Sequence, residues 1–231
     1  MAKKFAVIGL GSFGARVASE LTRHGAEVLA IDSDIEKLDD VKDRVAHTVR
    51  LDSTEEKPMR EQGLDEMDGV IVGLRDDFEA ELLTVSVLQQ IGVKRIIVIA
   101  TSQTHERILN HLEINEVVLP AIEAADRLST SLMFEQVLDS FSVTADYSIA
   151  EITAPDSFIG QTVQQLDFRT RFEISLITIK RMTTSTDFLG LRKRQVETII
   201  GVPTATTTIE RGDVLVVFGS KNAINKVTTV R

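Results

Sequence analysis

Apolar runs in the first half of the chain alternate with segments of helical period. Phe5-Ala6-Val7-Ile8 and Val28-Leu29-Ala30-Ile31 are apolar throughout, which is typical of strands covered on both faces of a sheet. Between such runs, apolar residues recur every three or four positions, as in helices that pack one face on a sheet. The alternation predicts strands near 4–8, 27–31, 47–51, 69–73, 95–99 and 116–119, and helices near 13–24, 34–43, 55–63, 78–91 and 104–112.

These elements predict an α/β fold. Six strands joined by crossover helices form a Rossmann-like doubly wound parallel sheet, which we expect over residues 1–122. Ligands of such sheets bind at the carboxyl ends of the strands. The residues expected to meet there are Gly9, Asp32, Asp52, Gly73 and Ala100.

A broad apolar surface follows Pro120. From residue 123 to 141, apolar residues cover more of a helix circumference than a single docking stripe needs. We therefore expect a crossover and dimerisation helix over 123–142, which packs on its own sheet and on a second copy of the chain.

The last part of the chain, residues 143–231, has a stricter two-residue alternation, as in Ser148-Ile149-Ala150-Glu151-Ile152. This pattern predicts a smaller α+β domain with further strands near 175–180 and 213–218. Helices fit near 160–166 and 220–227. The threonine-rich segment 182–208 is expected to form a long hairpin excursion.

A glycine motif, Gly9-Leu10-Gly11-Ser12-Phe13-Gly14, directly follows the first strand. In such motifs the first glycine makes the tight turn, the second admits a pyrophosphate, and the third packs helix on strand. The N–H groups at the helix start can then bind a phosphate. Asp32 closes the second strand, where a carboxylate accepts hydrogen bonds from ribose hydroxyls and disfavours a 2′-phosphate. The motif predicts a nucleotide site; the alternative is a glycine turn used only for close packing.

The composition of the chain limits which classes of partner and which cellular compartment the sequence predicts. The net charge of −9 argues against nucleic acid, whose phosphates bind basic surfaces. The lack of cysteine excludes disulfides and thiolate chemistry and suits a reducing compartment. No apolar run approaches the ~20 residues of a membrane-spanning helix, so we expect a cytoplasmic protein. The basic cluster Arg192-Lys193-Arg194 is interpreted as a solvated loop, with an anionic-lipid or partner contact as the alternative.

The sequence offers few residues for catalysis. His24 and His47 are expected at surface or capping positions, and His105 and His111 are six residues apart, on nearly opposite faces of one helix. Tyr147 is the single tyrosine. Hydride transfer needs an acid or base beside the cofactor. We therefore expect a nucleotide sensor without a metal rather than an enzyme; a small NAD-dependent oxidoreductase and an NADH-binding redox sensor are the alternatives.

The chain resembles the RCK (TrkA-type) regulators of potassium channels and transporters, and most closely the KtrA type of bacterial Ktr uptake systems. The resemblance rests on the glycine motif, on Glu27-Val28-Leu29-Ala30-Ile31-Asp32 and on Leu51-Asp52-Ser53-Thr54. The C-terminal half adds Ile159-Gly160, Leu166-Asp167-Phe168-Arg169 and Gly212-Asp213-Val214-Leu215-Val216-Val217-Phe218-Gly219.

The resemblance implies a cytoplasmic regulatory subunit at the inner face of the cell membrane. Homodimers would assemble into an octameric ring beneath a potassium-translocating subunit of the KtrB or TrkH type. Exchange of ATP for ADP, or binding of NAD(H) as in the TrkA branch, would shift the ring between conformations. The phosphates of the nucleotide would bind at the glycines. The ribose would bind Asp32, and the adenine edge would bind Asp52 and Ser53. The residues implied at the site are Gly9, Leu10, Gly11, Ser12, Phe13, Gly14, Asp32, Ser33, Asp52, Ser53, Gly73, Leu74 and Arg75.

Three positions depart from the family pattern. Ser12 stands where an arginine often favours a terminal phosphate. Ala121 stands where a glutamate commonly helps to bind a divalent cation, so no metal is expected there. Arg75 stands near a position that is usually small; it is hypothesised to reach the phosphates, and the alternative is an exposed arginine. Cyclic di-AMP is a further candidate ligand of the C-terminal domain, near Phe158, Arg169 and Ile174.

Overall fold

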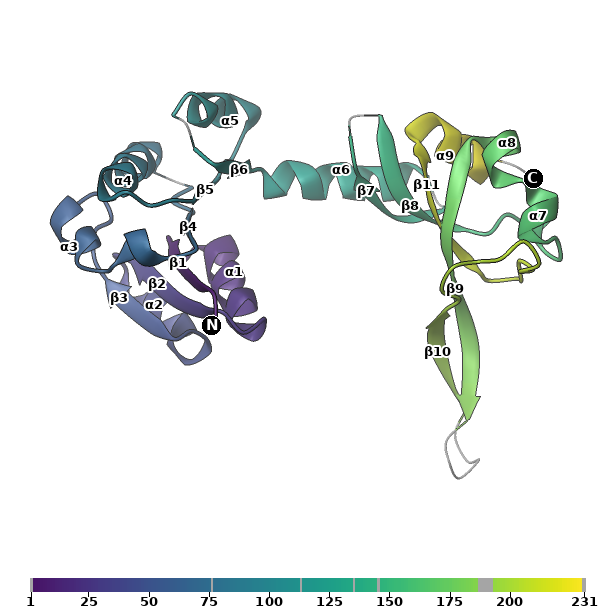
Figure 1. Cartoon of the computed structure of the whole chain (residues 1–231), viewed down its shortest axis with the longest axis horizontal. Coiled ribbons are helices and arrows are strands. Elements are labelled where there is room, and N and C mark those ends of the chain that lie inside the picture. The colour runs from purple at the N-terminus through teal and green to yellow at the C-terminus, as the bar shows by residue number, and fades with distance from the viewer. Residues whose placement is uncertain are drawn as a thin grey trace. The chain divides into compact units, whose positions relative to one another are not determined.

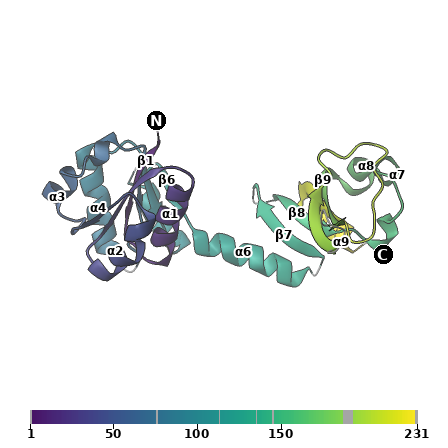
Figure 2. The same cartoon turned by 90° about the horizontal axis from the view of Figure 1, so that it is seen from below.

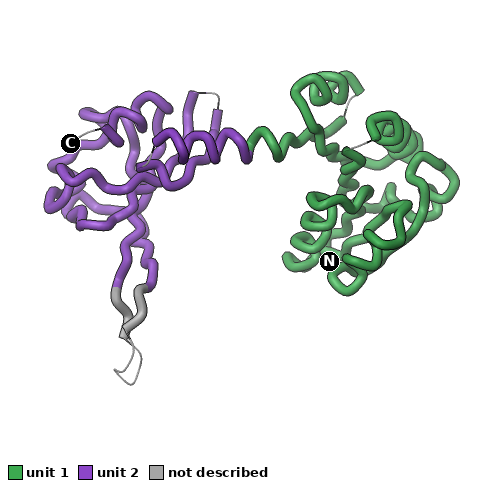
Figure 3. Tube along the Cα trace, turned by 180° about the vertical axis from the view of Figure 1, so that it is seen from behind, with its two compact units in different colours: residues 1–123 green, residues 124–231 purple. Residues whose placement is uncertain are grey.

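The computed structural model describes residues 2–75, 77–112, 114–134, 136–144, 146–186 and 193–229. The chain divides into two compact units, Met1–Glu123 and Ala124–Arg231, drawn in green and purple in Figure 3. Within the described ranges, no helix combines the length and the apolar composition needed to cross a membrane.

A parallel six-stranded sheet forms the N-terminal unit (Figure 1), in the order β3-β2-β1-β4-β5-β6. The strands are β1 (Lys4–Ile8), β2 (Glu27–Asp32), β3 (His47–Arg50), β4 (Gly69–Val72), β5 (Ile96–Ile99) and β6 (Glu116–Val118). The helices are α1 (Ser12–Arg23), α2 (Ile35–Val41), α3 (Glu56–Arg60), α4 (Phe78–Ile91) and α5 (Gln103–Asn110), with 3-10 turns η1 (Lys42–Arg44) and η2 (Leu64–Glu66). The predicted doubly wound sheet is confirmed.

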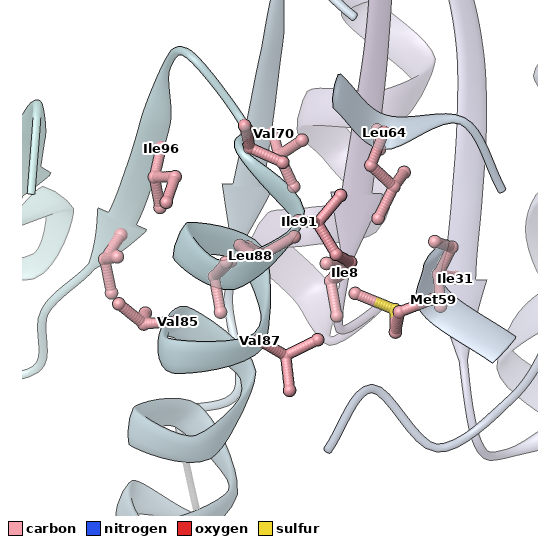
Figure 4. Close-up of a cluster of buried hydrophobic side chains, with 14 of the residues drawn as sticks. Ile8, Ile31, Met59, Leu64, Val70, Val85, Val87, Leu88, Ile91 and Ile96 are labelled. Atoms are coloured by element: carbon pink, nitrogen blue, oxygen red, sulfur yellow. The ribbon is translucent and has the colours of Figure 1, made fainter. Parts of the chain in front are cut away.

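Helices cover both faces of this sheet, which explains why its central strands are apolar throughout. On one face Ile8 lies in a cluster with Leu88 of α4 and Met59 of α3 (Figure 4). On the other face Val7 lies in a cluster with Ala18 of α1. Figures 1 and 2 show α1 and α4 on opposite sides of the strands. Each fully buried large apolar side chain contributes about 1.5–3 kcal/mol, so these two clusters hold the sheet and its helices together.

An antiparallel five-stranded sheet, in the order β10-β9-β11-β8-β7, forms the C-terminal unit. Its core lies around Ile152, Ile179, Leu215 and Val227. This is the predicted smaller α+β domain. The helix α6 (Pro120–Met133) includes the last residues of the first unit and the first residues of the second. The remaining elements are β7 (Val137–Ser142), β8 (Tyr147–Thr153), η3 (Asp156–Phe158), α7 (Val163–Leu166), α8 (Phe168–Phe172), β9 (Ile174–Thr186), β10 (Lys193–Ile199), β11 (Val214–Ser220) and α9 (Lys221–Thr228).

The predicted helix over 123–142 is wrong in its second half. Helix α6 ends at Met133, and β7 pairs antiparallel with β8. The spacing of Val137, Leu138 and Phe141 fits a helical period, but Val137 is buried in the core of the antiparallel sheet. Pairing with β8 therefore overrides the local pattern, as tertiary contacts do for short strands.

The helix predicted near 160–166 is also shorter than expected. Gly160 has a φ of +82°, a left-handed conformation that lies outside a helix. The helix α7 begins only after Thr162, whose side chain forms a capping box with Gln165. The following short helix, α8, was not predicted.

The described part of segment 182–208 includes a hairpin of β9 and β10, as predicted. The strands pair antiparallel from Ile199 opposite Lys180 outward. Thr183 and Thr198 lie side by side across it, with their hydroxyl oxygens 2.7 Å apart. Of the basic cluster at 192–194, Lys193 and Arg194 are the first residues of β10; Arg192 and the side chains of Lys193 and Arg194 lie outside the described part of the chain.

Candidate functional site

The carboxyl ends of the parallel strands line one cleft of about 580 Å³ in the N-terminal unit. This is the edge where ligands of doubly wound sheets bind. All of the predicted site residues line it except Leu10, Phe13 and Gly14, which pack behind the glycine loop. The lining consists of Ile8, Gly9, Gly11, Ser12, Ile31, Asp32, Ser33, Lys37, Leu51, Asp52, Ser53, Thr54, Gly73, Leu74, Arg75, Asp77, Glu79, Ala80, Leu83 and Thr101.

Each of the three motif glycines is needed for a different physical reason. Gly9 has a φ of +87°, and a Cβ there would lie 2.6 Å from the carbonyl oxygen of Gly73. A Cβ on Gly14 would lie 2.0 Å from the carbonyl oxygen of Gly9, so this glycine brings α1 against β1. Gly11 has an ordinary φ of −60°, and a Cβ there would meet nothing within 4 Å. The protein's own packing therefore requires Gly9 and Gly14, whereas Gly11 keeps space free at the cleft.

The start of α1 supplies unpaired backbone donors beside Gly11. The first intrahelical bond runs from the N–H of Ala15 to the carbonyl of Gly11, at 2.9 Å. The N–H groups of Ser12, Phe13 and Gly14 precede it and have no partner within the helix. Together with the helix dipole they favour an anion at this position.

Asp32 connects the end of β2 to the glycine loop. Its side chain is 7% exposed, and Oδ2 accepts the N–H of Leu10 at 2.7 Å. Oδ1 accepts the N–H of Asp34 at 2.9 Å, and Nζ of Lys37 lies 3.7 Å from Oδ2. A carboxylate accepts about four hydrogen bonds, so each oxygen keeps capacity for a ribose hydroxyl.

The residues after β3 are held in two different ways. Asp52 accepts hydrogen bonds from the hydroxyl and the N–H of Thr54, at 2.7 and 2.9 Å, and these bonds lower the pKa of Asp52. Asp52 is therefore ionised at neutral pH. Ser53 is 7% exposed and its Oγ lies 2.7 Å from Oγ1 of Thr84 on α4. Its hydroxyl is thus held against α4 and keeps capacity for a further hydrogen bond.

Two cationic side chains, Arg75 and Lys37, line the cleft. Arg75 was predicted. Lys37 was not, although its place on the helix that begins after Asp32 is a signal that could have identified it. Thr101 was also missed, although it directly follows Ala100, which was expected at this edge. The described residues contain no group of three His, Asp or Glu side chains arranged to hold a metal ion.

Of the three residues expected near a cyclic di-AMP site in the C-terminal unit, only Arg169 is exposed. Phe158 and Ile174 are each 2% exposed and belong to the core. Arg169 lines a shallow surface pocket with Val163 and Gln164.

Comparison with known proteins assigns both units to one family. The TrkA-N domain model matches residues 5–120 and the TrkA-C domain model matches residues 148–230. The chain is 33% identical over 226 residues to Ktr system potassium uptake protein C of Bacillus subtilis (strain 168), covering 98% of this chain and 96% of the relative. The chain belongs to the TrkA-type (RCK) family. Another member, Ktr system potassium uptake protein A of Vibrio alginolyticus, is 27% identical over 229 residues, covering 99% and 98% of the two chains.

Solved structures agree with this TrkA-type fold. The GsuK RCK domain has a TM-score of 0.64 at 15% identity, covering 100% of this chain and 48% of that chain. The NAD(P)-binding domain of an exopolyphosphatase-related protein from Archaeoglobus fulgidus has a TM-score of 0.50 at 26% identity, covering 56% of this chain and 96% of that domain.

Proposed function

We propose that this protein is a cytoplasmic regulatory subunit of a potassium uptake system, controlled by an adenine nucleotide in its N-terminal cleft. The observation that carries the proposal is Gly11, whose missing side chain leaves space at a helix N-terminus that the chain itself does not fill. Similarity over nearly the whole length to proteins named as Ktr potassium uptake proteins supports the regulatory role. In this proposal the nucleotide is a ligand that selects between conformations, and it is not consumed.

ATP and ADP are the proposed ligands. The donors at the start of α1 would hold the phosphates, Asp32 the ribose, and the segment Asp52-Ser53 the adenine edge. Ser12 provides no positive charge for a terminal phosphate, but Arg75 and Lys37 line the same cleft. These two side chains are the proposed counterparts of the phosphate charge.

NAD(H) is the second candidate ligand, because the Archaeoglobus fulgidus domain, which is 26% identical, is described as NAD(P)-binding. Asp32 suits the adenosine ribose of either nucleotide. A competition titration of ATP, ADP, NADH and cyclic di-AMP on the purified chain distinguishes them. We expect ATP and ADP to bind; NADH binding without any response to ATP or ADP would contradict the ATP/ADP proposal, and binding of none would contradict the nucleotide proposal altogether.

Replacing Arg75 by alanine tests its proposed phosphate contact. An arginine that reaches the terminal phosphate favours ATP over ADP, so Arg75→Ala should lower ATP affinity about tenfold and ADP affinity less, consistent with a charge-assisted hydrogen bond of about 1.5–3 kcal/mol. Isothermal titration of both nucleotides measures the ratio. Arg107→Ala, on the exposed face of α5, is the control. An unchanged ATP/ADP ratio would reject the contact.

Self-association into dimers and then an octameric ring belongs to the same proposal. No residue of α6 is buried, and Leu128, Leu132 and Met133 are 60, 73 and 76% exposed. On β7, Leu138 and Phe141 are also exposed. Exposed large apolar side chains of this kind are typical of a protein interface. A second group of exposed apolar side chains lies on α4, on α5 and just after α5: Phe78, Leu83, Ile108 and Leu112. This group supports a second contact, which would link dimers into a ring.

A charged residue on α6 should disrupt the proposed dimer. Leu132→Glu places a carboxylate in the apolar surface, so we expect the mass measured by light scattering to fall to a smaller species. Asn222→Glu, on the exposed side of α9, adds the same charge elsewhere and should leave the mass unchanged. Equal masses for wild type and Leu132→Glu would contradict an interface through α6.

A further inference from the structure

A buried glutamate and a buried histidine lie between α4 and α5. Glu81 is completely buried and His105 is 8% exposed. Oε1 of Glu81 lies 2.6 Å from Nε2 of His105. The ring of Phe78 stands edge-on to the imidazole, with the ring centroids 5.0 Å apart. Within the described residues, neither oxygen of Glu81 nor Nε2 of His105 has an aligned hydrogen-bond partner, so the short contact between Oε1 and Nε2 compensates the buried carboxylate poorly for its removal from water.

The pair is connected to the nucleotide cleft on both sides. On the α5 side, the N–H of Thr101 donates to Nδ1 of His105 at 3.2 Å, and Thr101 lines the cleft. On the α4 side, Thr84 lies one turn beyond Glu81 and shares a hydroxyl contact of 2.7 Å with Ser53, which also lines the cleft. These contacts connect the pair to residues of the cleft through α4 and through Thr101, which precedes α5.

The Thr101 contact determines the state of the imidazole. Because Nδ1 accepts an N–H, the proton of the neutral ring is on Nε2, facing Oε1 of Glu81. A proton added on Oε2 of Glu81 would be a buried donor without a partner among the described residues. A proton added on Oε1 instead faces Nε2 of His105, so the ring's own proton moves from Nε2 to Nδ1. Nδ1 would then face the Thr101 N–H as a second donor. The acceptor within reach is Oγ1 of Thr101, 3.3 Å from Nδ1, so the Thr101 backbone must turn.

Burial shifts the pKa of both side chains of the pair. It raises the pKa of Glu81 to about 7 and lowers the pKa of His105. Two groups this close exchange their proton as a unit, so the transition belongs to the pair. The charged groups on the elements packed around the pair are Asp77, which caps α4, Glu79 on α4, Glu106 and Arg107 on α5, Glu56, Lys57 and Arg60 on α3, Asp65 and Glu66 on η2, and Glu116 on β6.

We propose that Glu81 and His105 form a proton-binding pair that positions Thr101 and thereby makes nucleotide affinity depend on pH. The proposal rests on the proposed function of the cleft. When the pair holds one proton, the Thr101 N–H donates its hydrogen bond to Nδ1 of His105, and the cleft has the form described above. When the pH falls below about 7, the pair takes up a second proton, the Thr101 bond is lost and affinity falls. By linkage, bound nucleotide makes the pair harder to protonate.

Nucleotide affinity between pH 6 and pH 8 tests the proposal. We expect wild-type affinity for ADP, or for NADH if the competition titration selects it, to fall roughly fivefold toward pH 6 relative to Glu81→Gln, at the lower end of the usual coupling between sites. The same ligand is used on both proteins, so titration of its own phosphates cancels in the ratio. Glu81→Gln keeps the volume and removes the buried charge. Glu106→Gln makes the same chemical change one residue from His105 and should behave as wild type.

Two outcomes distinguish failure of the proton-binding proposal from failure of the nucleotide-site proposal. Parallel pH profiles for wild type and Glu81→Gln would overturn the proton-binding pair while leaving the cleft as a nucleotide site. Lack of binding by wild type at every pH would overturn the proposed function instead.

Nitrogen NMR of the wild-type His105 ring tests the same pair without a variant. At pH 8 we expect Nδ1 without a proton, with Nδ1 protonating as the pH falls. Saturation with nucleotide should move the midpoint to lower pH by about 0.7 units, the shift that corresponds to a roughly fivefold coupling. A midpoint that nucleotide does not move, or a ring that carries a proton on Nδ1 at pH 8, would overturn the proposal.

Discussion

Gly11→Ala should lower nucleotide affinity by roughly five- to 150-fold with little change in stability. A Cβ at this position meets no protein atom within 4 Å, so the fold accommodates it. It does occupy the space beside the first N–H groups of α1, where the phosphates are proposed to bind. Forcing an extra carbon into a close contact costs about 1–3 kcal/mol, which corresponds to that change in affinity. Isothermal titration with ADP or NADH and urea unfolding measure the two effects.

Gly14→Ala is the matched comparison, because it adds the same methyl group to the same motif. Its Cβ would lie 2.0 Å from the carbonyl oxygen of Gly9, so α1 must move away from β1. We expect the free energy of unfolding to fall by about 3 kcal/mol or more. If Gly11→Ala destabilised the protein as much as Gly14→Ala does, or left affinity unchanged, the motif would be a packing turn and the nucleotide site would be wrong.

Asp213→Ala should lower the free energy of unfolding of the C-terminal unit by about 3 kcal/mol. Asp213 is completely buried, and both of its oxygens accept hydrogen bonds from Arg181, each at 2.7 Å. Oδ2 also accepts the N–H of Glu210 at 2.8 Å, so the carboxylate joins β9 to the turn before β11. Removing one partner of such a pair leaves a poorly solvated charge, which costs about 3–5 kcal/mol. The value is at the lower end because Arg181 keeps Glu210 as a partner.

Tyrosine fluorescence provides a readout of this unit, because the chain has one tyrosine and no tryptophan. Tyr147 stacks on Phe218 of β11, with ring centroids 5.8 Å apart. Asp156→Asn removes the pairing of Asp156 with Arg211, 3.6 Å apart and largely exposed on both sides, and should leave the urea midpoint unchanged. Equal midpoints for Asp213→Ala and Asp156→Asn would show that the Arg181–Asp213 contact does not stabilise the unit.

The architecture of the N-terminal unit could be predicted from the sequence because a strand buried on both faces needs an uninterrupted apolar run. The predicted helix 78–91 matches α4 at both ends, with Asp77 capping its start and Gly92 in a left-handed conformation at its end. Prediction was less accurate where short elements depend on partners distant in the chain. The strand β7 has helical spacing and becomes a strand through pairing with β8.

The residues of the candidate site likewise divide into those that local sequence patterns identify and those that only the packed structure brings together. The glycine motif and Asp32 could be identified because a strand, a turn and a helix start are local features with characteristic residues. Lys37 and Thr101 belong to no motif and reach the cleft because neighbouring strands end at one edge. Glu81 and His105 were the hardest to identify, because a glutamate and a histidine 24 positions apart carry no periodic signal.

The sequence by itself determined the doubly wound sheet and the position of the glycine loop, because each depends on residues close together in the chain. The tertiary structure alone decided which of the glycines serve packing and which leaves space at the cleft. It also decided that α6 ends at Met133 and that Glu81 is enclosed beside His105. These features depend on distances between atoms from separate elements, and such distances exist only once the sheet and its helices have packed.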